Sequence, residues 1–195
     1  MSTNHFPGGA WPVMLTPFTS DNKVDYEGLK ALTNWYIDNG CSGLFSVCQS
    51  SEMFFLSKEE RVNIAKTVIE AADKRVPVIV SGHISDSYED QVDELTAIAA
   101  LNPDALIFIT NRFAKEDESD EIWRQNCEKV MQQLPESLPL GIYECPYPYK
   151  RLVSLENLKW CASTGRFFFL KDTCCDLSLL KARAAAVKGS NLKIY

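Results

Sequence analysis

Residues 76–109 read VPVIVSGHISDSYEDQVDELTAIAALNPDALIFI, and they indicate the fold class more clearly than any other part of the chain. Two apolar runs, at residues 76–81 and 105–109, predict buried strands. Between them, residues 88–100 carry apolar side chains at helical spacing and predict a helix. A strand, a helix and a second strand in this order are typical of a parallel sheet whose faces are covered by helices.

The same alternation extends along the whole chain. Six apolar runs and the start of a seventh predict strands at residues 10–15, 43–47, 76–81, 105–109, 140–143, 167–171 and 192–195. Amphipathic segments predict helices at residues 25–39, 57–72, 88–100, 119–133, 154–162 and 177–187. Ser57 followed by Glu60 predicts a capping box, and Ser154 predicts a helix N-cap. The sequence therefore indicates an α/β protein with six strand–helix units and the beginning of a seventh.

Two architectures fit this alternation, an open doubly wound sheet and a closed (β/α)₈ barrel. A nucleotide-binding doubly wound sheet usually carries a glycine-rich turn after its first strand. Here the first predicted strand ends in Leu15-Thr16-Pro17-Phe18, which favours the barrel. A barrel takes about 250 residues. We therefore expect residues 1–195 to form a single barrel domain that is incomplete at its C-terminal end. An open-sheet binding module complete in 195 residues is the alternative.

The composition is that of an ordinary globular protein and argues against two classes of partner. The chain is 46% hydrophobic and 24% charged, and its formal net charge of −6 leaves no basic patch for nucleic acid. No apolar stretch reaches the roughly 18 residues of a membrane span. Residues 1–9 lack the pattern of a signal peptide, so we expect a cytoplasmic protein.

The cysteines do not predict a metal site. There are seven of them with only two histidines, and no pair has the spacing of a zinc finger. We expect no metal and no cofactor, and we interpret the cysteines as reduced, mostly buried thiols. Redox activity of the adjacent Cys174 and Cys175 is the alternative.

Two residues at predicted strand ends carry the candidate chemistry. Barrel enzymes place catalytic groups at the carboxyl ends of their strands. Lys171 follows the apolar run 167–170, where partial desolvation favours the uncharged amine that attacks a ketone to form an imine. Tyr143 ends the preceding strand, close enough to shuttle protons in the same cavity. For Lys171 the alternatives are an ion pair with Asp172 or a side chain that reaches water.

The turn after the second predicted strand is a candidate carboxylate site. It reads Cys48-Gln49-Ser50-Ser51-Glu52, and consecutive backbone N–H groups in such a turn bind anions. Ser50 adds a hydroxyl donor or a proton relay to Tyr143. An ordinary polar loop is the alternative.

Taken together, these motifs resemble the dihydrodipicolinate synthase / N-acetylneuraminate lyase family. The resemblance rests on Thr16-Pro17, on residues 46–52, on Tyr143-Glu144-Cys145-Pro146 and on Leu170-Lys171-Asp172, and it extends from about Gly8 to Tyr195. It implies a lyase, aldolase or dehydratase that acts on pyruvate or another 2-oxo acid. It also implies that Lys171 forms the Schiff base, Tyr143 relays protons, and Gln49 with Ser50 binds the substrate carboxylate. A homo-oligomer, tetramer or dimer, is the expected assembly.

The sequence departs from the family pattern at three places. The usual Gly-Thr-Thr-Gly-Glu is Cys48-Gln49-Ser50-Ser51-Glu52, the tyrosine pair after the fourth strand is replaced by Asn111-Arg112-Phe113, and Pro148 stands where the synthases carry arginine. A role in lysine biosynthesis is therefore not expected. Arg112, Lys150 and Arg151 are candidates for binding a second anionic group. The alternative to an enzyme is a non-catalytic barrel that binds an oxo acid or serves as an assembly partner.

Overall fold

The computed structural model describes residues 6–195, so most of the N-terminal segment that we expected not to be a signal peptide lies outside the described residues. One parallel sheet of six strands runs through the described part of the chain. The strands are β1 (Leu44–Ser46), β2 (Val78–Val80), β3 (Ala105–Ile109), β4 (Leu140–Tyr143), β5 (Phe167–Lys171) and β6 (Lys193–Ile194). Their spatial order follows the chain from β1 to β6. A doubly wound sheet would reverse its order, so the prediction of a barrel is confirmed.

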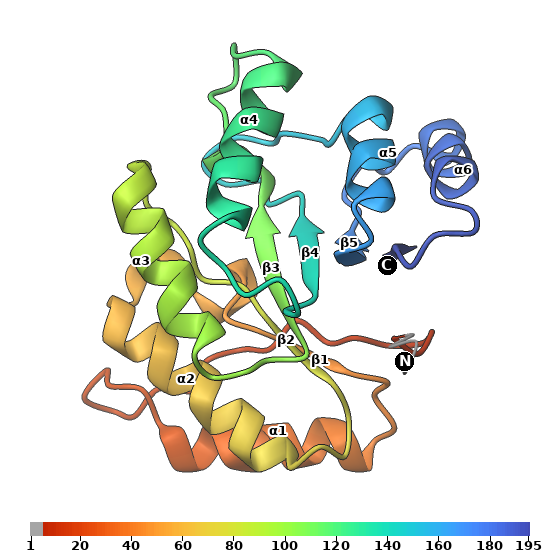
Figure 1. Cartoon of the computed structure of the whole chain (residues 1–195). Helices are drawn as coiled ribbons and strands as arrows, with labels where there is room; N and C mark the ends of the chain where they lie inside the picture. The colour runs from red at the N-terminus through yellow and green to blue at the C-terminus, as the bar shows by residue number, and fades with distance from the viewer. Residues whose placement is uncertain (1–5) are drawn as a thin grey trace.

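Six α-helices alternate with the strands and lie outside the curved sheet (Figure 1). They are α1 (Tyr26–Asp38), α2 (Lys58–Ala72), α3 (Tyr88–Ala99), α4 (Asp120–Met131), α5 (Leu155–Ser163) and α6 (Leu177–Ala186). The predicted starts are confirmed where a capping side chain is present. Ser57 and Glu60 form the reciprocal capping box of α2, and the Ser154 side chain accepts a hydrogen bond from the amide of Asn157 at α5.

The first predicted strand, residues 10–15, differs from the expectation. It runs parallel to β1 and exchanges hydrogen bonds with it, from the Met14 amide to the Phe45 carbonyl at 2.9 Å and from the Phe45 amide to the Pro12 carbonyl at 3.0 Å. Only Val13 forms a bridge with Phe45. Proline has no N–H to donate, so Pro12 keeps this segment from forming a regular ladder. The segment nevertheless lies at the edge position predicted for a first strand.

The curvature brings the N-terminal segment against the last strand. Phe169 of β5 stacks on Tyr195 with ring centroids 4.1 Å apart, and Trp11 lies edge-on to both rings at 5.2 and 5.5 Å. Figure 1 accordingly shows the start of the red segment, which begins at residue 6, on the same side of the molecule as the C-terminal end. Gly43 makes room for this cluster, because a Cβ atom there would lie 2.3 Å from the Trp11 ring. An aromatic layer therefore fills the interior at this end of the sheet.

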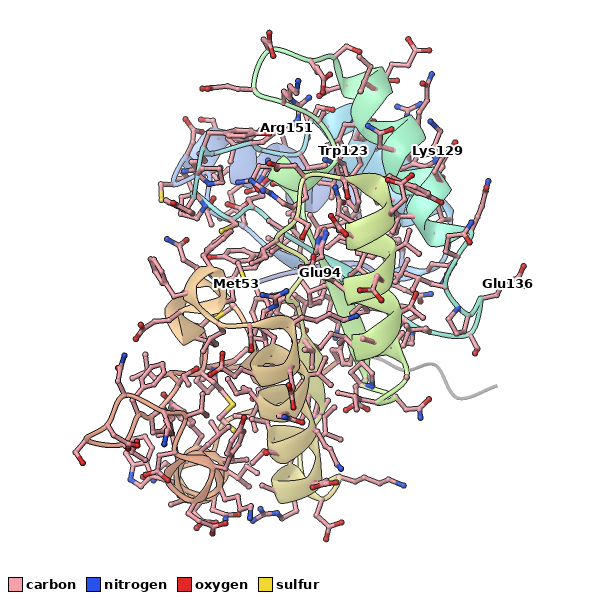
Figure 2. The ribbon with its side chains drawn as sticks, turned by 90° about the vertical axis from the view of Figure 1, so that its left-hand side faces the viewer. Met53, Glu94, Trp123, Lys129, Glu136 and Arg151 are labelled. Carbon is pink, nitrogen blue, oxygen red and sulfur yellow. The ribbon has the colours of Figure 1, made fainter. Side chains whose placement is uncertain are left out.

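Helix α4 covers the sheet with an apolar face and presents polar side chains outward. On α4, Trp123 is 1% exposed and its indole N–H donates to the Thr110 carbonyl at 2.9 Å. In Figure 2 Trp123 lies between α4 and the strands, whereas the exposed Lys129 and Glu136 lie toward the outer surface. Among residues 6–195 no helix combines the length and the apolar character needed to cross a membrane.

Candidate functional site

The two residues predicted to carry the chemistry end neighbouring strands. Tyr143 is the last residue of β4 and Lys171 the last residue of β5, and the sheet register pairs them directly. The Lys171 Nζ atom lies over the Tyr143 ring, 5.0 Å from its centroid. The structure thus brings together two residues whose carboxyl-end positions were expected from the strand pattern alone.

The Lys171 side chain is only half-buried, although the strand before it is almost completely enclosed. Phe167 and Phe169 are each 1% exposed and Leu170 is fully buried. Asp172, the neighbouring carboxylate, forms its ion pair with Arg183. The alternative interpretation of Lys171 as the partner of Asp172 is therefore not supported, and among the described residues no carboxylate pairs with the amine above the Tyr143 ring.

Tyr143 lies in an apolar setting that keeps its hydroxyl protonated. The residue is 4% exposed, and its ring packs edge-on against Phe45 with centroids 5.6 Å apart. Burial raises the pKa of Tyr143 well above its usual value, and the nearby thiols of Cys145 and Cys48 raise it further. A neutral phenol beside an amine is able to donate a proton to a developing oxyanion or amine.

Gln49, one of the two predicted carboxylate-binding residues, contacts Tyr143 directly. Gln49 begins the 3₁₀ turn η1 (Gln49–Ser51), and its Oε1 atom accepts hydrogen bonds at 3.4 Å from both the Tyr143 hydroxyl and the Cys145 thiol. Ser50 is exposed. The partner of the Tyr143 hydroxyl is therefore the Gln49 amide and not the Ser50 hydroxyl that we considered as a relay.

Two hydrogen bonds fix η1 against the segment that contains Met14 and Thr16, and a third closes the turn itself. The Thr16 hydroxyl donates to the Ser51 carbonyl at 2.8 Å, the Ser51 hydroxyl donates to the Met14 carbonyl at 2.6 Å, and the Cys48 amide donates to the Ser51 hydroxyl at 3.1 Å. Gln49 and Ser50 are the first two residues of this turn, so their N–H groups have no acceptor within it. This leaves two adjacent amide donors of the kind that bind a carboxylate.

The loss of glycines in this turn has no local backbone cost. Cys48 has a φ of −109°, a conformation open to any residue. Positive φ angles occur instead at Val47 (53°) and Glu52 (61°). Val47 is β-branched, so its left-handed conformation is strained and marks the turn as a constrained segment.

Sequence reasoning did not single out Cys145 and Asn111 as parts of this region. Cys145 is fully buried, two residues beyond Tyr143, and the alternation of side chains along an extended chain places it on the same side. Burial raises the pKa of the Cys145 thiol. The Asn111 amide donates to the carbonyls of Cys145, Tyr147 and Tyr149 at 3.0, 2.9 and 2.6 Å and so holds the loop after β4. The alternation rule would have found Cys145, whereas nothing in the sequence pairs Asn111 with that loop.

The cationic residues considered for a second anionic group donate to groups other than Tyr143 and Lys171, and Arg112 reaches the region through a 3.0 Å hydrogen bond from its Nε atom to the Asn111 side-chain oxygen. Arg112 donates to the Ile84 carbonyl and to Asp86, each at 2.9 Å, and lines a cavity of about 580 Å³ that neither Tyr143 nor Lys171 lines. The remaining two donate mainly to backbone carbonyls, Lys150 to that of Thr173 and Arg151 to those of Lys115 and Glu118. Each of the three side chains thus donates to at least one group of the protein itself.

The described residues were expected to contain no metal site, and the state of the cysteines bears on the redox role considered for Cys174 and Cys175. Within residues 6–195, no group of three or more histidine, cysteine or acidic side chains is arranged to hold a metal ion. The seven cysteines are free thiols, with Cys174 half-buried and Cys175 exposed. The redox role considered for this pair stays a prediction.

Comparison with known proteins places the chain as a whole. Residues 7–192 match the Dihydrodipicolinate synthetase family. Among solved structures, the fold is similar to a chloride-inhibited dihydrodipicolinate synthase from Acinetobacter baumannii complexed with pyruvate, at 25% identity and a TM-score of 0.83 over 94% of this chain and 61% of that one. A prophage protein of the dihydrodipicolinic acid synthase family from E. coli K12, also in complex with pyruvate, gives 25% identity and a TM-score of 0.80 over 91% and 58%.

A third solved structure shares the fold at lower identity. It is the N-acetylneuraminate lyase from Mycoplasma synoviae, with 22% identity and a TM-score of 0.76 over 94% of this chain and 60% of that one. The chain thus spans about three fifths of the length of these solved structures, which share its strand–helix order. Its sequence match from residue 7 to residue 192 and this shared fold lead to one assignment: the chain belongs to the dihydrodipicolinate synthetase family.

Proposed function

We propose that the protein is a Schiff-base lyase or aldolase, or a dehydratase of the same type, acting on pyruvate or another 2-oxo acid. The observation that carries the proposal is the position of the Lys171 amine, which forms no ion pair within residues 6–195 and lies 5.0 Å from the ring centroid of a buried Tyr143. Two relatives of similar fold are described as complexes with pyruvate, which supports a 2-oxo acid as substrate.

Lys171 forms the covalent bond in this proposal. Its uncharged Nζ attacks the ketone carbon, the resulting carbinolamine loses its oxygen as water, and a protonated imine remains. The Tyr143 hydroxyl supplies the proton that the leaving oxygen needs, and the phenolate that remains takes a proton from the carbon beside the imine, which restores the phenol and gives an enamine. The imine then acts as an electron sink, so that a bond to the adjacent carbon breaks or forms.

The turn η1 holds the substrate in this proposal. The free amides of Gln49 and Ser50 bind the carboxylate of the 2-oxo acid. The Gln49 side-chain oxygen accepts from Tyr143 and Cys145, so its amide nitrogen takes no part in these two hydrogen bonds and is a further donor that the proposal assigns to the substrate. A glutamine here orients the Tyr143 hydroxyl but does not pass protons onward as a hydroxyl does.

Borohydride trapping tests the imine before any substrate partner is known. Reduction in the presence of pyruvate converts the imine to a stable secondary amine, so intact mass is expected to rise by one pyruvate-derived group, and peptide mapping is expected to place it on Lys171. Lys171→Arg keeps the charge but forms no imine, so it should abolish trapping in a protein that still folds. The natural full-length protein is the material for this test. Trapping that survives Lys171→Arg would refute the assignment.

A non-catalytic barrel is the second candidate, and one observation favours it. Gln49, an amide, contacts the Tyr143 hydroxyl where the family pattern carries a hydroxyl residue. A protein that binds a 2-oxo acid without turning it over needs the amides of η1 but not Lys171. It would therefore bind pyruvate in calorimetry and show the same affinity after Lys171→Arg, with no trapping in either form.

A further inference from the structure

A fully buried ion-pair network lies directly behind the candidate site. Arg183 of α6 and Glu144, the residue after β4, both have 0% side-chain exposure and approach to 2.6 Å. Arg183 also pairs with Asp172, the residue after β5, whose side chain is 9% exposed. Since Glu144 follows Tyr143 and Asp172 follows Lys171, one arginine contacts the immediate neighbours of both candidate catalytic residues.

Every acceptor position of the Glu144 carboxylate is used. Oε1 accepts from the Arg183 Nη2 atom and from the Val153 amide at 2.9 Å, and Oε2 accepts from the Arg183 Nη1 atom at 3.1 Å and from the Thr173 amide at 2.9 Å. Arg183 Nη2 donates further to the Val153 carbonyl at 2.7 Å. A buried charged pair is tolerated only when such hydrogen bonds offset its desolvation, and here they are nearly complete.

The network adds a connection between two strand ends that the sheet register already pairs. Beyond the paired residues Tyr143 and Lys171, the sheet continues only through the Glu144 amide, 3.3 Å from the Lys171 carbonyl, and the Thr173 hydroxyl, 2.9 Å from the Glu144 carbonyl. The Glu144 carboxylate and Arg183 reinforce this junction from the helix layer. The alternation of side chains explains the arrangement, because residues that follow the inward-facing pair point outward toward α6.

We infer that Glu144, Asp172 and Arg183 are positioning residues that lock the carboxyl ends of β4 and β5 and so hold the Lys171 amine over the Tyr143 ring. This inference deepens the proposed function and rests on it for its catalytic consequence. A displacement of about 1 Å between reacting groups lowers rates by roughly 10²-fold. A network that sets the relative position of the two side chains therefore controls proton transfer without touching the substrate.

The chain offers a matched control at another position. Arg61 of α2 and Glu94 of α3 form a second buried pair, 2.6 Å apart with 5% and 7% side-chain exposure. Glu94 accepts from the amides of Ile84 and Ser85, after β2, and so serves a different strand end. In Figure 1 α2 and α3 lie on the opposite side of the molecule from α6, and Figure 2 labels Glu94 beside α3.

The test compares Arg183→Lys and the milder Asp172→Asn with Arg61→Lys, in the natural full-length protein. Two rates are measured with pyruvate as the probe: borohydride trapping on Lys171, and exchange of the pyruvate methyl protons in D₂O, which requires proton transfer as well as the imine. Arg183→Lys should lower exchange by roughly 10²-fold and trapping by much less, and Asp172→Asn should lower exchange by a smaller factor. Arg61→Lys should leave the ratio of the two rates unchanged.

Amide hydrogen exchange separates failure of this inference from failure of the proposed function. If the wild-type protein neither traps pyruvate nor exchanges its methyl protons, the proposed function is refuted. The role of the network is then tested by the hydrogen-exchange rates of the backbone amides of Glu144 and Thr173. These amides should exchange at least tenfold faster in Arg183→Lys and in Asp172→Asn, and at the wild-type rate in Arg61→Lys. Unchanged protection in both network variants, or an equal effect of Arg61→Lys on either readout, would overturn the inference.

Discussion

Removing the hydroxyl of Tyr143 separates its chemical role from its structural role. The change Tyr143→Phe keeps the ring that packs against Phe45 and that lies beneath the Lys171 amine. It deletes one hydrogen bond, to the Gln49 side chain, whose length of 3.4 Å exceeds the usual O–H···O range of about 2.5–3.0 Å. A typical hydrogen bond contributes about 0.5–1.5 kcal/mol to stability. We therefore expect Tyr143→Phe to lower the free energy of unfolding by about 0.5 kcal/mol or less.

The expected cost to the reaction is much larger than the cost to stability. A positioned acid–base group is worth roughly 10²–10⁴-fold in rate, or about 2.7–5.5 kcal/mol in activation free energy at 1.36 kcal/mol per tenfold. Burial raises the pKa of Tyr143, so the residue acts as a neutral proton donor. Gln49 is an amide and does not take over this role.

Exchange of pyruvate methyl protons in D₂O, followed by NMR, is the assay. Tyr143→Phe should slow exchange by roughly 10²–10⁴-fold while borohydride still traps pyruvate on Lys171. Tyr149→Phe is the control, because that hydroxyl donates to the carbonyls of Asn111 and Ala114 at 2.7 and 2.6 Å. It should lower the free energy of unfolding by about 1 kcal/mol and change exchange by at most a few-fold. Equal exchange rates in Tyr143→Phe and the wild type would refute the proton-transfer role.

Two further predictions concern the scaffold. Gly141→Ala places a Cβ atom 2.4 Å from the Ile107 side chain, so overpacking should lower the free energy of unfolding in urea by about 1–3 kcal/mol, and an unchanged midpoint would contradict the packing. His83 is fully buried and accepts from the Ile109 amide, and burial lowers its pKa to about 3. The unfolded chain therefore binds one more proton between about pH 6.5 and pH 3. As the pH is lowered through this window, the free energy of unfolding should decrease by up to about 1.4 kcal/mol per pH unit. His83→Gln should reduce that slope by one proton, and an unchanged slope would show that His83 does not set it.

Much of the scaffold follows from local sequence patterns. Strands β3, β4 and β5 begin and end where the apolar runs do, and the helix starts at Ser57 and Ser154 follow their capping side chains. These features depend on side-chain periodicity and on hydrogen bonds between residues three or four positions apart, which the order of residues specifies directly. The first edge segment is the exception, because Pro12 interrupts a ladder that its apolar neighbours would otherwise form.

In the candidate site, too, some features follow from local sequence patterns and others do not. That Lys171 and Tyr143 end neighbouring strands was expected from the sequence, because parallel strands in chain order place their carboxyl ends at one edge. The contact of Gln49 with Tyr143, 94 positions apart, and the burial of Arg183 against Glu144, 39 positions apart, were not. Such pairs depend on how far the sheet curls and on which face each helix turns inward. Only tertiary packing decides these two quantities, since they arise from the sum of many contacts and not from any local pattern.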